Sequence, residues 1–116
     1  EAVAMGRNNQ VIATGGSAIG NNNQAMAMYS TAIGNDNYAI GENSSAIGLG
    51  NNITANDATA LGNKNTASGI SAGAVGISNT ASGHNAQAFG YLNEATAQDS
   101  QAFGAQNKAL CQCFRA

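Results

Sequence analysis

The segment from Asn43 to Asn51, "NSSAIGLGN", places one isoleucine between an alanine and a glycine. Nearly the same pattern occurs on both sides of it, as "GSAIGNNN" (16–23), "YSTAIGNDN" (29–37) and "DATALGNKN" (57–65). The segment is therefore one unit of an internal repeat. The period of a repeat restricts the architecture more than any local propensity, so the repeat is considered first.

Three columns of identical residues, each a set of positions 14 apart, define the repeat without one insertion. The glycine column is Gly6, Gly20, Gly34, Gly48, Gly62, Gly76, Gly90 and Gly104. Alanine stands two positions before each glycine, and asparagine stands three positions after it. Between alanine and glycine lies a larger apolar residue, and we call this set the apolar column: Met5, Ile19, Ile33, Ile47, Leu61, Val75, Phe89 and Phe103.

Each unit contains a second, related half. Seven residues after each column glycine stands a small residue: Ala13, Ala27, Gly41, Ala55, Gly69, Gly83, Ala97 or Cys111. The residues just before these are Ile12, Met26, Ile40, Thr54, Ser68, Ser82, Thr96 and Leu110. Helix is disfavoured, because each interior glycine would cost about 1 kcal/mol. We expect short strands joined by corners rich in asparagine.

One unit thus predicts one coil of an all-β solenoid, with two strands and two corners per 14 residues. Eight coils stacked at about 4.8 Å would form a rod of about 40 Å. We expect a single repeat domain over residues 1–110 and a tail over 111–116. The corner asparagines suit left-handed backbone. They could instead stack as a ladder of hydrogen-bonded amides, and the sequence leaves both interpretations open.

The apolar column should point out of the coil. Strand alternation sends alanine and glycine to one face and the residue between them to the other. The interior is then thin, and the column from Met5 to Phe103 forms an exposed row of the kind that marks an interface. Burying its eight side chains would contribute about 1.5–3 kcal/mol each. We therefore predict an obligate homo-oligomer with this column as its core, and three narrow rods enclose such a column more naturally than two.

Composition argues against several functions. Only 9% of residues are charged and the net charge is −2, so no basic stripe exists to bind nucleic acid. No apolar run of about 18 residues indicates membrane insertion of this segment, and no signal peptide is visible. The sequence begins inside the repeat, which suggests a piece of a longer protein.

No motif indicates an enzyme, a cofactor or a metal. His84 is interpreted as a solvated turn residue, and the acidic residues form no repeating pair or calcium ladder. Cys111 and Cys113 are interpreted as thiols near a frayed end, with cross-chain pairing as the alternative.

One flank of the rod differs between its two halves. The outward position of the second half-unit is apolar at Ile12, Met26 and Ile40 and mainly Ser or Thr afterwards, and Met28, Tyr29 and Tyr38 lie beside it. This flank is a candidate partner-binding face, although single surface hydrophobes are common. A regular outer column of Ser and Thr is also compatible with an ice-binding protein, but the mixture with Ile in this column disfavours that function. A third possible function is a purely structural spacer in a fibre.

Residues 2–110 resemble the head repeats of trimeric autotransporter adhesins, the YadA-like head. The resemblance rests on "GSAIGNNN", "NSSAIGLGN", "ATALGNKNTASG", "AGAVGISNTASG" and "QAFGAQNKAL". It implies a left-handed parallel β-roll, a homotrimer, a location on the bacterial cell surface and adhesion to host matrix or cell-surface ligands. The neck and coiled coil of that family are not seen, and the tail cysteines are atypical for it.

The resemblance also implies a ligand-binding element. The family element N-S-x-A-I-G matches Asn43, Ser44, Ala46, Ile47 and Gly48. The sequence therefore predicts an extracellular, multivalent adhesin head segment. Trimeric phage or viral tail fibres resemble the same repeat, so a structural or receptor-binding fibre segment of a virion is the alternative.

Overall fold

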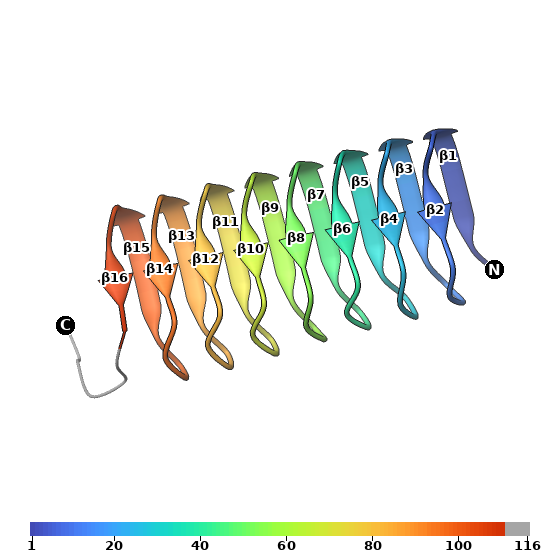
Figure 1. Cartoon of the computed structure of the whole chain (residues 1–116). Coiled ribbons are helices and arrows are strands. Elements are labelled where there is room, and N and C mark those ends of the chain that lie inside the picture. Colours follow the sequence, from blue (N-terminus) through green and yellow to red (C-terminus); the bar gives the residue numbers. More distant parts are fainter. Residues whose placement is uncertain (111–116) are drawn as a thin grey trace.

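Each 14-residue unit forms one coil of a parallel β-solenoid, and eight coils stack along the chain (Figure 1). The structure, a computed structural model, describes residues 1–110. The predicted tail 111–116, with both cysteines, lies outside the described residues. Every coil has one five-residue strand followed by one two-residue strand.

The long strands form one eight-stranded sheet, called sheet A. Its strands are β1 Val3–Arg7, β3 Ser17–Asn21, β5 Thr31–Asn35, β7 Ser45–Leu49, β9 Thr59–Asn63, β11 Gly73–Ile77, β13 Gln87–Tyr91 and β15 Gln101–Ala105. The short strands form sheet B, with β2 Gln10–Val11, β4 Gln24–Ala25, β6 Tyr38–Ala39, β8 Asn52–Ile53, β10 Thr66–Ala67, β12 Thr80–Ala81, β14 Glu94–Ala95 and β16 Lys108–Ala109.

In both sheets, paired residues of neighbouring strands are 14 positions apart in the sequence, which is the period of the repeat. Ala46 of β7 pairs with Ala60 of β9, and Ile47 pairs with Leu61, so equivalent residues of successive coils lie side by side. Parallel pairing follows because every coil runs in the same sense as the coil before it. The molecule measures 43 × 21 × 11 Å, which confirms the rod length and the thin section predicted from the repeat.

Alanine methyl groups fill the interior between the two sheets. The alanine column of sheet A, from Ala18 to Ala102, is buried, as predicted. The inward residue of sheet B is its second strand residue, such as Ala25, Ala67 or Ile53. The small residues that the sequence pattern placed on this strand, such as Ala27, follow it at the second corner instead. The core is one methyl-rich layer.

The column glycines are fixed by the stacking of the coils. Gly48 has a φ of 128°, a conformation that side chains rarely adopt, and a Cβ there would lie 2.0 Å from the carbonyl oxygen of Gly62 in the next coil. The other column glycines before the last coil have the same environment. Any side chain at these positions would push successive coils apart.

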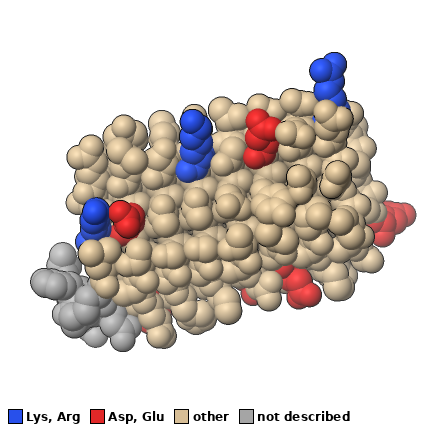
Figure 2. Space-filling view, viewed as in Figure 1, with Lys and Arg blue, Asp and Glu red and all other residues tan. Residues whose placement is uncertain are grey.

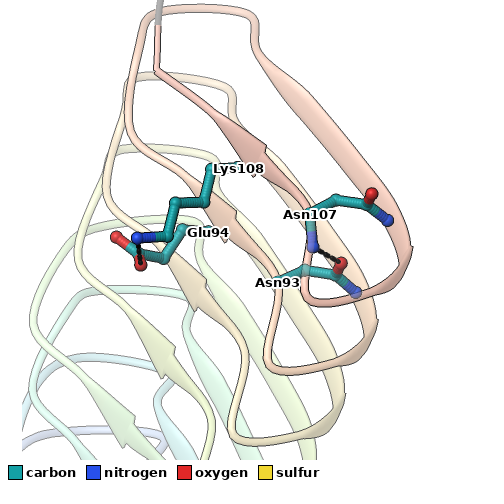
Figure 3. A network of polar contacts seen from close by, with 4 residues as sticks. All are labelled: Asn93, Glu94, Asn107 and Lys108. Atoms are coloured by element: carbon teal, nitrogen blue, oxygen red, sulfur yellow. Dashed lines mark hydrogen bonds and ion pairs between the residues drawn. The ribbon is translucent and has the colours of Figure 1, made fainter.

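The asparagine column forms a buried ladder, which settles the question that the sequence left open. The Nδ2 group of Asn65 donates to Asn51 Oδ1 at 3.1 Å and to the carbonyl oxygens of Leu61 and Gly76 at 2.9 and 2.8 Å. Figure 3 shows the last step of the ladder, where the Asn107 backbone N–H donates to Asn93 Oδ1 at 3.0 Å.

The left-handed conformation belongs to a different corner position from the one the sequence suggested. It is adopted by the residue before each ladder asparagine: Asn8, Asn22, Asp36, Gly50, Lys64, Ser78, Leu92 and Gln106. Turning the chain at that residue aims the next side chain, the asparagine amide, back into the coil. The polar corner is therefore a structural part of the core.

Candidate binding surfaces

The apolar column lies on the outer face of sheet A along the whole rod. Alanine points inward at the second position of each long strand, so the third position must point outward. Met5 and Phe103, at the two ends, are 59% and 57% exposed, and the residues between them are half-buried or exposed. The rings of Phe89 and Phe103 stack with centroids 5.0 Å apart. The predicted outward direction of this column is confirmed for the single chain.

Two further columns flank the apolar column on the same face. We call the first residues of the long strands the leading flank: Val3, Ser17, Thr31, Ser45, Thr59, Gly73, Gln87 and Gln101. The last residues form the trailing flank: Arg7, Asn21, Asn35, Leu49, Asn63, Ile77, Tyr91 and Ala105. The trailing flank is polar in the second and third coils but exposes Leu49, Ile77 and Tyr91 later. Sequence reasoning missed these residues, although the same alternation places them outward.

Sheet B carries the apolar flank that the sequence predicted in its N-terminal half. Ile12, Met26 and Ile40 follow the first three short strands in successive coils, and Ile12 is 69% exposed. Tyr38 is half-buried and lies two residues before Ile40. The same column continues with Thr54, Ser68, Ser82 and Thr96, all exposed. This column therefore changes from apolar to polar after Ile40, and it ends with the exposed Leu110.

Met28 and Tyr29 lie at the second corner of their coil, at the edge of this flank. Both are exposed, and Tyr29 has a left-handed φ of 59°. Its ring lies against Gly15 of the preceding coil, where a Cβ would approach the ring carbon Cδ1 within 2.5 Å. The tyrosine is thus held over the corner and presents one side to solvent.

The family's N-S-x-A-I-G element is divided between core and surface. Ser44 and Ala46 are fully buried, and the Ser44 Oγ donates to the Gly41 carbonyl at 2.6 Å. Both side chains are covered by their own coil in the single chain, and their role in ligand binding stays a prediction. Gly48 has no side chain and is required by the close stacking of its coil on the next. Asn43 and Ile47 remain at the surface, and Ile47 also belongs to the apolar column.

Charged side chains are scattered over the surface. Figure 2 shows isolated cations and anions on one face and no patch of a single sign. Lys108 and Glu94 pair at 3.7 Å, with their side chains 64% and 42% exposed (Figure 3). Within residues 1–110, no three His, Cys, Asp or Glu side chains gather as a metal site would require. His84 is an exposed corner residue, as predicted.

In-register coils, a buried amide ladder and an outward apolar column define a repeat protein of the β-roll class. The chain belongs to the YadA head domain repeat family, the head repeats of trimeric autotransporter adhesins, because the family model matches residues 1–23, 12–37, 27–51, 54–76 and 67–93. No curated protein and no solved structure matches the chain. Within the described residues, no helix is long and apolar enough to cross a membrane.

Proposed function

We propose that this chain is an extracellular adhesin head segment that works as a homotrimer on the bacterial cell surface. The observation that carries the proposal is the apolar column, which stays uncovered along the full 43 Å of the rod. Continuous apolar surface of this kind is typical of an interface. A core of alanine side chains and Ile53 offers little other apolar burial to stabilise the coil.

Threefold packing covers the column best. Three rods with sheet A facing a common axis would enclose the side chains from Met5 to Phe103 between them. Cyclic symmetry closes such an assembly and leaves no apolar face open. The stacked pair Phe89 and Phe103 would be part of the same core.

Sheet B and the corners then remain for the ligand. The apolar flank of Ile12, Met26 and Ile40, with Tyr38 beside it and Met28 and Tyr29 at its corner, is the proposed contact surface. Asn43 lies at a second corner and is also accessible there. Each trimer would present three copies of this surface, so weak single contacts add up to firm attachment to a matrix protein or receptor. Ile47 is assigned to the trimer core rather than to the ligand, because both roles need the same face.

The test separates assembly from adhesion. Sedimentation of the wild-type chain should give a trimer, and Ile33→Asp should dissociate or unfold it, because three carboxylates would meet at the axis. Thr54→Asp, an outward change on sheet B, is the matched control and should leave the trimer intact. A folded, stable wild-type monomer would overturn the assembly. Binding of the intact trimer to immobilised matrix proteins and glycans then tests adhesion, and no binding to any of them would contradict it.

A further inference from the structure

The two flanks of sheet A should meet in the proposed trimer, on which this inference rests. Rotation about an axis parallel to the rod keeps every coil at its own height. The leading flank of one subunit then faces the trailing flank of its neighbour in the same coil. Each coil therefore predicts one contact pair, made of its own first and last long-strand residues.

The pairs of the second to sixth coils follow a pattern, whereas Val3 with Arg7, Gln87 with Tyr91 and Gln101 with Ala105 do not. Three coils pair a hydroxyl with an amide, as in Ser17 with Asn21, Thr31 with Asn35, and Thr59 with Asn63. The trailing residue becomes a large aliphatic side chain in two coils, at Leu49 and Ile77. In those coils the leading residue is Ser45 and Gly73, respectively, and Gly73 is the smallest residue of its flank.

The backbone does not require a glycine at position 73. Gly73 does not have the positive φ of the column glycines. A Cβ there would meet the flexible Gln87 side chain, with Oε1 at 2.3 Å, and would touch Phe89 Cε1 at 3.4 Å. Thr59, at the same position of the preceding coil, shows that this place accepts a side chain. The Gln87 side chain of the next coil therefore takes the place of the missing side chain and covers Gly73, which is buried.

A hollow lies beside Gly73 and Gln87 on the outer face of sheet A. Its lining includes Thr59, Leu61, Gly73, Val75, Gln87 and Phe89. Three of these residues belong to the apolar column and form an apolar side. Gln87 leans over Gly73 and donates from Nε2 to the Ser71 carbonyl at a long 3.3 Å, so a weak contact holds this wall in place.

We propose that this hollow receives Ile77 of a second copy of the chain, seated between the apolar column and Gln87. Ile77 is 48% exposed in the single chain and lies in the same coil, on the opposite flank. We call the contact between this hollow and Ile77 of the neighbour the socket. Three such contacts, one at each subunit boundary, would fix the height of the subunits relative to one another. A shift by one coil would set Ile77 against Thr59 or Gln87 instead, so the socket determines the register of the trimer.

Cysteine cross-linking tests the contact in the full chain with Cys111 and Cys113 replaced by Ser. Gly73→Cys combined with Ile77→Cys should give covalent trimers on a non-reducing gel, and neither single variant should. Gly73→Cys with Ala105→Cys is the matched control. Ala105 lies on the trailing flank like Ile77, but two coils further along, about 10 Å along the rod from the height of Gly73. A disulfide cannot span this distance.

The outcomes separate this inference from the trimer itself. Ile33→Cys alone reports the axis and should give covalent dimers. If Ile33→Cys cross-links and the 73/77 pair does not, or if the 73/105 pair cross-links equally well, the socket is wrong and the trimer stands. If neither the 73/77 pair nor Ile33→Cys cross-links and the chain sediments as a monomer, the proposed assembly fails as well.

A stability measurement gives a second test, because Gly73→Thr should change the melting temperature in opposite directions with and without the contact. Threonine is the better strand residue, and the flexible Gln87 side chain can move away from a Cβ at position 73, so Gly73→Thr should hold or raise the melting temperature if no neighbour fills the hollow. With Ile77 of a neighbour in the hollow, the same change should lower the melting temperature at fixed protein concentration. In an Ile77→Ala background that loss should disappear, as expected for residues in contact. Gln101→Thr, on the same flank, controls for the residue type, and an equal rise for both threonine variants overturns the socket.

Discussion

Asn65 donates two hydrogen bonds to one oxygen of Asn51, from its backbone N–H at 3.0 Å and from its Nδ2 at 3.1 Å. Asn65 Oδ1 in turn accepts the same two bonds from Asn79 in the following coil. Side chain and backbone of each coil are thereby tied to the next at a buried position. Polar groups buried this way must all be satisfied, so the ladder couples the folding of neighbouring coils.

The first prediction concerns a break in this ladder. Asn65→Ala removes the amide, and with it the bonds to the Leu61 and Gly76 carbonyls, one of the two bonds to the Asn51 oxygen, and the acceptor of the Asn79 N–H. Each unsatisfied buried group costs about 1–3 kcal/mol, so we expect a loss of at least 3 kcal/mol in the free energy of unfolding, or failure to fold. Denaturant unfolding at fixed protein concentration measures it. Asn52→Ala, at an exposed position, should change stability by less than about 0.5 kcal/mol, and equal losses would contradict the ladder's role.

Much of this fold could be predicted from the repeat. The 14-residue period gives the length of the coil. Successive strand residues point to opposite faces, so if alanine lines a thin interior, the apolar column must lie outside. Corner geometry could not be predicted. Residues as different as Asn22, Lys64 and Leu92 share the left-handed conformation, since the buried asparagine after them imposes it on the backbone.

The candidate surfaces could be predicted only in part. The outward direction of Ile12 and Ile47 and the burial of Ala46 followed from alternation, but the burial of Ser44, which lies at the corner before the strand, did not. The hollow above Gly73 depends on the side-chain path of Gln87, which no pattern encodes. What covers each outer face is a property of the assembly, beyond the pattern of one chain.

A second prediction distinguishes two glycines that are two residues apart. Gly48→Ala should prevent stacking, because its methyl group would lie 2.0 Å from the Gly62 carbonyl oxygen at a φ of 128°. We expect a loss above about 3 kcal/mol or no folded protein. Gly50→Asn is the control: Gly50 occupies the left-handed corner position where Asn22 stands in another coil, and a Cβ there would make only an ordinary contact with Lys64 Cγ at 3.5 Å. Circular dichroism during thermal unfolding should show native-like melting for Gly50→Asn only, and comparable melting of both variants would refute the stacking argument.

A third prediction is that salt has little effect on folding. The described residues contain one ion pair, Lys108 with Glu94, and both side chains are well exposed. Exposed pairs contribute about 0–1 kcal/mol and are screened by salt. Lys108→Met should therefore leave the melting temperature within about 2 °C of wild type. A large drop in melting temperature between low and physiological salt would show that charge, rather than burial and amide bonding, holds the rod together.

The last prediction tests the apolar flank of sheet B as the ligand surface. Replacing Ile12, Met26 and Ile40 together by Thr should weaken adhesion of the trimer to its matrix ligand by at least tenfold, because three apolar contacts are lost in every subunit and multivalency multiplies the loss. The melting temperature should hold, since these side chains point away from both the core and the trimer axis. Surface binding with wild-type and variant trimers measures the change. The control exchanges Ser68 and Ser82 for Thr in the polar half of the same column, and it should bind as wild type does. Unchanged adhesion of the triple variant would move the ligand site to the corners, where Asn43 and Tyr29 are exposed and are the residues to replace next.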